Sequence, residues 1–470
     1  MLQHPAQFGW NSLNANQAIS RQDSMKHIEE PATSIPVMAE TDVLVVGGGP
    51  GGLSAALAAA REGVETLLVE RSGCFGGVIT QAMVGTVAWY RTNEKVVDAG
   101  GIGVEFEQRA KEMEASLPIF LYQVLDTEKF KYIADQMVQE AGIVPLLHCH
   151  TTNVIMEGNT IKGVITESKS GRQAILAKRV IDATGDADLA CRAGAPYRKD
   201  PKHELEGVTV NFGCSGVDIQ RFLDYTLNNP SSIADWGDQS GDKEEREFST
   251  YLVEPFNRAK EAGEIPEDVR LESYWGSFTD AGEIPNLNAI HMSDIDSTDV
   301  WDLTRAEIEG RQRVMWAVDA LKKYTPGFEQ ARLRTIGSSL GTRESRKIIG
   351  DYNITEQDVL NEARFEDSIG ISPEFLDGNG IAIMPSTGRY FHVPYRITLP
   401  QRVENLLVAG RCVAGDKVSH AATRQMMCCT VTGQGAGVAA AVSLKNNATC
   451  RDVDVSGVQK ALEKQAVRIE

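Results

Sequence analysis

The first strong hydrophobic pattern in the chain is a short apolar run, a glycine-rich turn, a helix and a second apolar run. Residues 43–46 read Val-Leu-Val-Val, which is typical of a buried parallel strand. After the turn at 47–52, the stretch 53–61 predicts a helix that Gly63 ends. A second strand is expected at 66–69. This order predicts a β-α-β unit within a parallel sheet.

The turn has the spacing G-x-G-x-x-G. Its first glycine allows a tight turn, its second lets the backbone approach a pyrophosphate, and its third lets helix and strand pack closely. The N–H groups at the helix start attract phosphate. Glu70 lies eighteen positions beyond the third glycine, where a carboxylate can accept hydrogen bonds from ribose hydroxyls. The predicted contacts of this loop with a dinucleotide are Gly47, Gly49, Pro50, Gly51 and Gly52.

Further apolar patterns follow before residue 200. Helical periodicity occupies two stretches, 104–115 and 127–141. A strand is expected at 143–149, and two strand-like runs around a Lys-Ser-Gly turn predict a hairpin within 161–176. The run 179–185 then reads as a buried strand that ends in a glycine.

The pattern changes from about residue 200 and returns near residue 403. The stretch 238–247 is polar and predicts a loop, and 299–323 has helical periodicity. A buried strand is expected at 403–411, followed by a helix of small residues at 430–443. We therefore expect the two ends of the chain to build one domain. The predicted parts are an N-terminal arm at 1–40, a nucleotide-binding domain at 41–200 with a helical excursion near 90–140, a substrate or cap domain at 201–400, and a closing part with a C-terminal helix at 401–470.

Composition narrows the class of protein. At 470 residues, with 42% hydrophobic and 24% charged residues, the chain matches an ordinary globular enzyme of two or three domains. Its net charge of −18 argues against nucleic acid or an anionic membrane as the main partner. We expect no transmembrane segment and no signal peptide. Eight cysteines without zinc spacing predict reduced thiols in a cytoplasmic protein and no metal site.

Three later segments favour FAD over a nicotinamide cofactor. A glycine pair after the second strand permits another close approach of the backbone to the dinucleotide, and glycines end the strands near 185 and 410. The expected start of the last core helix would present N–H groups to the negative charge of a reduced flavin. These segments supply Gly76, Gly77, Ala183, Gly185, Gly410, Arg411, Gly433, Gln434 and Gly435 as candidate cofactor contacts.

At this point the chain resembles a known family, the FAD-dependent oxidoreductases of the glutathione-reductase-like structural class. More narrowly, it resembles a bacterial group with the motif G-T-R-E-S-R, found here at 341–346. The likeness covers nearly the whole chain and is weakest at 200–330. It implies an α/β fold in which a Rossmann-like FAD-binding domain with a three-stranded β-meander is interrupted by an α+β substrate domain. It also implies tightly bound FAD, contacted in addition by Arg71 and the backbone of Val154.

Departures from better-defined relatives are informative. Cys74 lacks the partner of the C-x-x-x-x-C redox pair found in disulfide reductases that bind two dinucleotides, and a second dinucleotide motif is missing. The glycine pair leads into Val-Ile-Thr rather than the histidine that carries covalent FAD in fumarate-reductase-like subunits. We therefore expect FAD to be bound non-covalently. The electron partner stays open between oxygen, a nicotinamide and another protein.

Three residues are candidates for catalysis. His420, just before the last core helix, is a candidate acid or base, although a lone histidine is more often structural. Arg343 or Arg346 of the G-T-R-E-S-R motif would orient an anionic substrate group. An internal ion pair that braces the domains explains the same motif equally well.

These observations predict an FAD-dependent oxidoreductase that transfers a hydride between flavin N5 and a small polar or anionic organic molecule. Two other classes are kept as alternatives. One is a redox-neutral flavoenzyme of the isomerase or hydratase type, and the other is a flavin-carrying electron-transfer subunit. The direction of the reaction and the formation of a homo-oligomer are both open.

Overall fold

The structure, a computed structural model, describes residues 27–86, 99–119, 122–230, 233–235, 248–275, 277–378, 381–383 and 388–470. The chain divides into two compact units, 1–36 and 37–470. In the first unit, the described residues 27–36 carry no helix or strand. Strand β1 begins at Val37, so the arm predicted at 1–40 is four residues shorter than expected.

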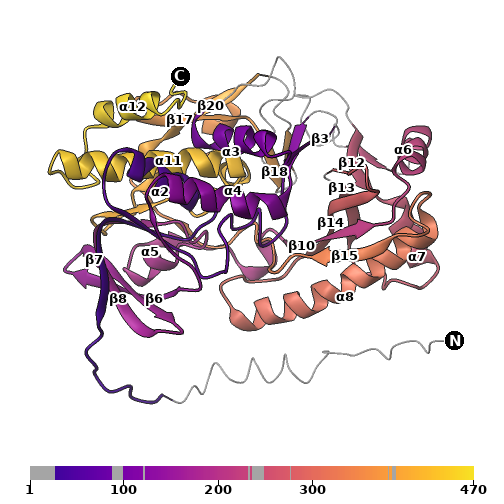
Figure 1. The fold of residues 1–470 in the computed structure, drawn as a ribbon, viewed down its shortest axis with the longest axis horizontal. Helices are drawn as coiled ribbons and strands as arrows, with labels where there is room; N and C mark the ends of the chain where they lie inside the picture. The colour runs from indigo at the N-terminus through magenta and orange to yellow at the C-terminus, as the bar shows by residue number, and fades with distance from the viewer. Residues whose placement is uncertain are drawn as a thin grey trace. The chain divides into compact units, whose positions relative to one another are not determined.

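A seven-stranded mixed sheet organises the second unit (Figure 1). Its order is β5-β2-β1-β8-β7-β6, and β21 also pairs with β8. The contacts of β1, β2, β5, β8 and β21 are parallel, whereas β6, β7 and β8 form an antiparallel meander. The strands are β1 (Val37–Val46), β2 (Thr66–Val69), β5 (Val144–Leu146), β6 (His150–Glu157), β7 (Thr160–Ser168), β8 (Gly171–Asp182) and β21 (Leu406–Val408). The α/β class predicted from the sequence is confirmed.

Strand β8 joins the meander to the parallel part of the sheet. Its first half pairs with β7, as in Val164 with Ile175. Its last residues lie between two parallel neighbours, since Ile181 is level with Val45 of β1 and Leu407 of β21. The hairpin strand and the buried strand predicted separately from the sequence are therefore one strand of twelve residues. Its end brings residue 183 to the carboxyl edge of the sheet, where ligands bind in such folds.

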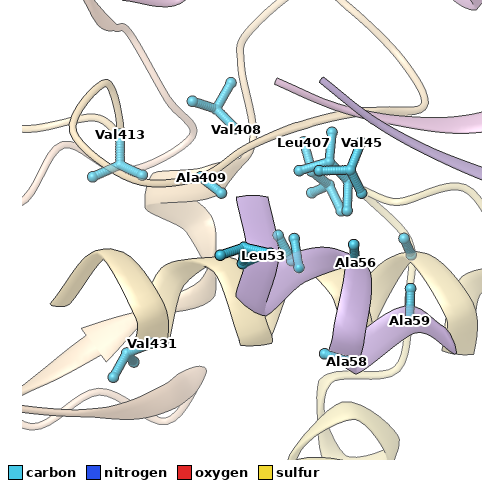
Figure 2. Packing of buried hydrophobic residues seen from close by; sticks show 14 of the residues in the cluster. Val45, Leu53, Ala56, Ala58, Ala59, Leu407, Val408, Ala409, Val413 and Val431 are labelled. Atoms are coloured by element: carbon cyan, nitrogen blue, oxygen red, sulfur yellow. The ribbon is translucent and has the colours of Figure 1, made fainter. Parts of the chain in front are cut away.

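Helices surround this sheet, and the longest of them lies in the core. They are α2 (Pro50–Arg61), α3 (Gly101–Glu112), α4 (Thr127–Glu140), α5 (Asp188–Arg192), α9 (Glu356–Leu360), α10 (Lys417–Thr423), α11 (Met426–Lys445) and α12 (Val455–Lys464). Figure 2 shows α2 crossing α11 beside Val45 and Leu407. By length and composition α11 is apolar enough to cross a membrane, but 94% of its most apolar stretch is buried inside the protein.

A second sheet forms the cap (Figure 1). It is antiparallel, with the order β11-β12-β13-β14-β10-β15, and α8 packs on it. Helix α8 confirms the helix predicted at 299–323, and the Asp299 side chain caps its N-terminus. The cap elements are β10 (Val208–Ser215), α6 (Ile219–Asn228), β11 (Ile233–Asp235), β12 (Phe248–Leu252), α7 (Glu254–Glu261), β13 (Leu271–Trp275), β14 (Glu283–Met292), α8 (Val300–Tyr324) and β15 (Arg332–Ile336). The loop predicted at 238–247 lies outside the described residues.

The hydrophobic core divides at a different place from the one predicted. The cap cluster runs from Val208 to Leu340, with Val124 added. Residues from Ile348 to Leu399 pack in the cluster of the main sheet, so this core begins before the boundary predicted near 400. The remaining strands form two-stranded pairs: β9 (Tyr197–Arg198) with β16 (Lys347–Ile348), β17 (Ser368–Pro373) with β20 (Tyr390–Pro394), β18 (Leu376–Gly378) with β19 (Ile381–Ile383), and β3 (Ser116–Ile119) with β4 (Tyr122–Leu125).

Candidate functional site

A cavity of about 730 Å³ lies between the main sheet and the cap. This volume is within the usual range of small-molecule and cofactor sites, roughly 300–1,000 Å³. One end is lined by the glycine-rich turn and Glu70, and the other by Thr209 and Asn288 of the cap sheet. Of the residues predicted from the sequence, those that line it are Gly47, Gly49, Pro50, Gly51, Glu70, Arg71, Gly77, Ala183, Gly185, Arg343, Gly410 and Arg411.

Glycines from three loops meet backbone to backbone at the cavity wall. A Cβ on Gly77 would lie 2.6 Å from the Cα of Gly49, and a Cβ on Gly51 would lie 3.2 Å from the Cα of Gly410. Gly410 has a φ of +82°, and its N–H donates to Thr432 Oγ1 of α11 over 3.0 Å. This part of the wall is therefore bare main chain, which a flat cofactor can approach closely.

Helix α2 directs its N-terminus at this wall. Gly49 is its N-cap and has no side chain to satisfy the first N–H groups, and Pro50 occupies the first helical position. The first bond of the helical ladder runs from Leu53 N to Gly49 O over 2.8 Å. Gly52 lies behind the wall, where a Cβ would be 1.7 Å from the carbonyl oxygen of Gly47. Its role is the close packing that the motif predicts, and it does not line the cavity.

Glu70 is held in place by main-chain donors. Its carboxylate accepts hydrogen bonds from Gly48 N at 2.7 Å and from Ser72 N at 2.8 Å, and only 7% of the residue is exposed. The carboxylate thus ties the glycine-rich turn to the end of β2. Each oxygen keeps further lone pairs for a hydroxyl ligand.

Asp182 organises the loop after β8, a role that the sequence alone does not reveal. The carboxylate is fully buried and accepts bonds from Thr184 N and Oγ1 and from the N–H groups of Leu189 and Ala190. Burial raises the pKa of Asp182, and the bonds from Ala190 and Thr184 oppose this rise. Loop 183–187 is thereby fixed against α5.

Arg411 connects this loop to the G-T-R-E-S-R motif. Its guanidinium donates to Asp186 Oδ1 at 2.9 Å and to Ser345 Oγ at 3.2 Å. The same guanidinium lies over Gly185, where an added Cβ would be 2.9 Å from Nη2. Arg411 lines the cavity as an already paired cation, so it braces the wall rather than supplying a free charge.

Different residues of the G-T-R-E-S-R motif match the two roles considered for it, orientation of a substrate and an internal ion pair. Arg343 lines the cavity, and its Nη1 donates to Gly207 O at 2.9 Å. Arg346 does not line it and instead donates to Asp188 Oδ1 at 2.6 Å. Glu344 pairs with Lys347, and both side chains are almost completely buried. The motif is thus mainly an internal ion-pair network, from which one arginine faces the cavity.

His420 lies outside the cavity. The residue is 1% exposed within α10, and its Nε2 is 3.1 Å from the carbonyl oxygen of Arg411. Burial lowers the pKa of His420 well below its usual value, and the charges of Lys347 and Arg424 add to the effect. A neutral, enclosed imidazole does not reach a substrate in this cavity.

The expected anion site at 433–435 is also wrong, because α11 begins at Met426. Residues 433–435 lie in the middle of the helix, where their N–H groups serve the helical ladder. Gly433 and Gly435 are packing positions, and Gln434 Oε1 accepts from Ile102 N at 2.9 Å. The actual start of α11, Gln425 and Met426, lines the cavity.

Two other predicted contacts lie off the cavity wall. Gly76 has a φ of +109°, and its N–H donates to Gly48 O at 2.8 Å, which fixes the loop beside Gly77. Val154 lies within β6, and the preceding segment 149–151 lines the cavity in its place. Among the described residues no group of histidine, cysteine or acidic side chains is placed to hold a metal ion.

A model of one protein family matches residues 42–462, and its description is FAD dependent oxidoreductase. The match covers the main sheet, the cap and the closing helices. The chain belongs to the FAD dependent oxidoreductase family.

Individual relatives of this family member match it less completely. Thiamine thiazole synthase of Methanococcus vannielii is 33% identical over 188 residues, which is 36% of this chain and 65% of that protein, so this chain spans just under two thirds of its length. The protein of the same name from Saccharolobus islandicus is 33% identical over 208 residues, 42% of this chain and 72% of its own. A solved geranylgeranyl bacteriochlorophyll reductase-like protein from Thermoplasma acidophilum is 15% identical, covers 91% of this chain and 83% of its own, and has a TM-score of 0.47.

The cofactor of this oxidoreductase is FAD, and the cavity wall fits it. The glycine junction exposes main chain where the pyrophosphate of a dinucleotide needs close approach, next to the N-terminus of α2. Glu70 stands at the end of β2, where an acid binds the ribose of such cofactors. Sequence reasoning named Arg424 as a minor candidate for the wall, but it missed other lining residues, because they come from separate parts of the cap and of segments beyond it: Thr209, Asn288, Ser338, Ser339, Leu340, Phe375 and Asp377.

Proposed function

We propose that this protein transfers a hydride between FAD and a small polar or anionic organic substrate, which binds at the cap end of the cavity. One observation supports this above the others. A single cavity connects the glycine junction and Glu70 with Arg343 and the cap-sheet residues Thr209 and Asn288. The cofactor end and the polar cap end therefore share one enclosed space, as hydride transfer requires.

The chain supplies binding, orientation and charge, while bound FAD supplies a two-electron acceptor or donor. Arg343 lines the cavity and is anchored through Nη1 to Gly207 O, so its guanidinium is held where it can orient an anionic substrate. Thr209 and Asn288 add hydroxyl and amide groups, already bonded to each other. The same arrangement serves oxidation and reduction. Proton transfer is not assigned to His420, whose ring is enclosed.

Several finer points belong to the same proposal. The G-T-R-E-S-R segment and the glycine-rich turn support membership of the glutathione-reductase-like class. Non-covalent attachment of FAD is supported by the segment after Gly77, which holds valine, isoleucine and threonine. Eight free cysteines support a reducing, cytoplasmic location. Thiazole synthesis is not proposed, because the alignments with thiamine thiazole synthases leave more than half of this chain unmatched.

The test begins with the visible spectrum of the purified protein before and after denaturation. We expect a yellow protein that releases free FAD into the supernatant. Candidate substrates are then mixed with the protein under anaerobic conditions, and bleaching of the flavin absorbance is recorded over time. Arg343→Gln should keep FAD and lower the second-order rate constant of bleaching about 10- to 100-fold, whereas Arg334→Gln, an exposed cap arginine paired with Glu283, should leave it unchanged.

Other outcomes identify the alternatives. Conversion of a substrate without bleaching and without an electron acceptor indicates a redox-neutral flavoenzyme. A stable complex with a partner protein and no turnover alone indicates an electron-transfer subunit. Reoxidation of the bleached protein by oxygen, by a nicotinamide or only by a protein identifies the electron partner. A protein that neither contains FAD nor binds it on reconstitution contradicts the proposal.

A further inference from the structure

Arg424 is a nearly buried arginine on the wall of the cavity. It follows α10 directly, and the N-cap of α11, Gln425, comes next. Arg424, Gln425 and Met426 all line the cavity. Only 10% of the Arg424 side chain is exposed. The guanidinium is therefore nearly withdrawn from bulk water but still forms part of the cavity wall.

The partners of Arg424 do not satisfy its charge. Its Nη2 donates to the carbonyl oxygen of Asp377, and the nearest carboxylate oxygen, Asp377 Oδ2, is 3.6 Å away on a side chain that is 47% exposed. Its Nε is buried and has no hydrogen-bond partner among the described residues. Burying a cation is unfavourable unless an anion and full hydrogen bonding compensate. An anion that enters the cavity would supply the missing negative charge beside the guanidinium.

Arg343 bonds to a short segment, 206–207, that also lies near Arg424. Its Nη1 bonds to Gly207 O, while a Cβ on Gly378 would lie 3.0 Å from Glu206 Oε1 and 3.4 Å from Arg424 Nη2. The two guanidinium groups therefore flank one stretch of backbone at the substrate end.

The other acidic side chains of the cavity wall already accept hydrogen bonds from groups other than Arg424. Glu70 accepts from Gly48 N and Ser72 N, Asp186 from Arg411, and Asp188 from Arg346. Among the described wall residues, Asp377 is the acid nearest to Arg424, and it does not come within hydrogen-bond distance. Apart from Asp377, no acid of the described cavity wall is therefore placed to neutralise Arg424.

We infer that Arg424 binds a carboxylate group of the substrate, so that the substrate class is a small organic acid. This inference rests on the proposed function and adds the chemical group that the cavity recognises. Arg424 positions that group with the part of its guanidinium that lines the cavity, while its Nη2 stays bonded to Asp377 O. Arg343 orients the other polar end of the molecule. The N-terminus of α11, next to Arg424, favours negative charge at the same place.

The test uses the FAD-loaded protein and three dicarboxylates, malonate, succinate and glutarate, each compared with its neutral diamide. Binding is measured by the change in flavin absorbance. We expect at least one dicarboxylate to bind, and its diamide to bind at least tenfold more weakly. Arg424→Gln should raise the dissociation constant about 10- to 100-fold without changing FAD content, and Arg424→Lys should retain part of the affinity. Arg334→Gln on the cap surface should not change it.

The possible failures are distinguishable. A colourless protein that cannot be reconstituted contradicts the proposed function itself. A yellow protein whose flavin responds to no dicarboxylate, or equally to acids and diamides, overturns the inference about Arg424 alone. The inference is also overturned if Arg424→Gln weakens FAD binding and leaves carboxylate binding intact, because Arg424 would then be a cofactor contact. The comparison of acid with amide on the unmodified protein keeps the test valid even if the variants do not fold.

Discussion

In both the main-sheet region and the cap region, a long helix packs closely on neighbouring elements. The atoms that make the closest contacts differ between the two regions. In the main-sheet region, α11 meets α2 main chain to main chain: a Cβ on Gly433 would lie 2.0 Å from Gly51 O, and one on Gly437 would lie 2.2 Å from Ala55 O. In the cap, a Cβ on Gly310 of α8 would meet the side chain of Val210 at 2.5 Å. Backbone cannot yield, whereas a side chain can shift.

This difference follows from what each region does. The cofactor end needs main chain held at fixed distances, so small residues such as Ala56 and Ala59 of α2 let the helices and strands approach closely (Figure 2). Under the proposed function, the cap end needs side chains that match a substrate, and the wall residues there come from β10, β14 and the segment 338–343. Backbone contacts thus fix the first region, which we call the frame, whereas side chains that can shift line the second.

The buried ion pair Glu344–Lys347 should show the largest effect, because it lies where the two regions meet. Both side chains are almost fully buried, and Glu344 Oε2 also accepts from Glu206 N at 3.0 Å. Lys347→Met leaves a buried, uncompensated carboxylate and should lower the free energy of unfolding by about 3–5 kcal/mol in urea titrations. The double variant Glu344→Leu/Lys347→Met should lose less than Lys347→Met alone. A double variant with a lower free energy of unfolding than both Lys347→Met and Glu344→Leu would contradict this account.

The sequence predicts the main-sheet region better than it predicts the substrate end. The β-α-β unit, the hairpin, Glu70 and α8 are recognisable because local periodicity and glycine spacing determine them, whereas the meander was expected from the family resemblance. The start of α11 was misplaced by four residues, since Gln425 and Met426 carry no capping signature. The glycines within the helix were therefore interpreted as a helix start that faces the reduced flavin.

The substrate end is poorly predicted because sequence spacing does not encode it. Thr209 and Asn288 are 79 positions apart and meet only through the pairing of β10 with β14. Asp377 and Arg424 likewise meet across the chain. His420 was chosen for its chemistry, and the structure buries it. No local pattern distinguishes an arginine that faces a cavity, such as Arg343, from one that braces a domain, such as Arg346.

Matched glycine substitutions test the comparison directly. Gly433→Ala should lower the free energy of unfolding by about 3 kcal/mol, because the new methyl group collides with the backbone of α2. Gly310→Ala should cost only about 1 kcal/mol, because Val210 can shift. Both glycines lie inside helices, so the gain in helix propensity cancels in the comparison. Equal losses in urea titrations would contradict the distinction between backbone and side-chain contacts.

Glu70→Gln tests whether the frame also determines cofactor affinity. The amide keeps the shape of the carboxylate but places its NH₂ group against one of the two N–H donors, Gly48 or Ser72. We expect the dissociation constant of FAD to rise about 10- to 30-fold, or about 2 kcal/mol. Fluorescence of released FAD on dilution measures this. Glu157→Gln on the exposed meander should leave the affinity unchanged, and an unchanged Glu70→Gln variant would remove Glu70 from the site.

The smallest effect should come from two enclosed imidazoles, His420 in the main-sheet region and His291 in the cap. Burial lowers the pKa of His420 in the main-sheet region and of His291 in the cap well below the usual value of 6.5, and nearby arginines contribute in both cases. Below pH 6.5 the unfolded chain therefore binds protons that the folded protein does not, so stability is complete above pH 6.5 and falls as the pH drops below it. The loss is at most about 1.4 kcal/mol per pH unit for each histidine. In urea titrations between pH 7.5 and 5.5, His420→Asn and His291→Asn should each reduce this slope by a similar amount. A slope that neither variant changes would show that other groups cause the acid sensitivity, and a slope that only one variant changes would show that the two regions differ in how completely they enclose their histidine.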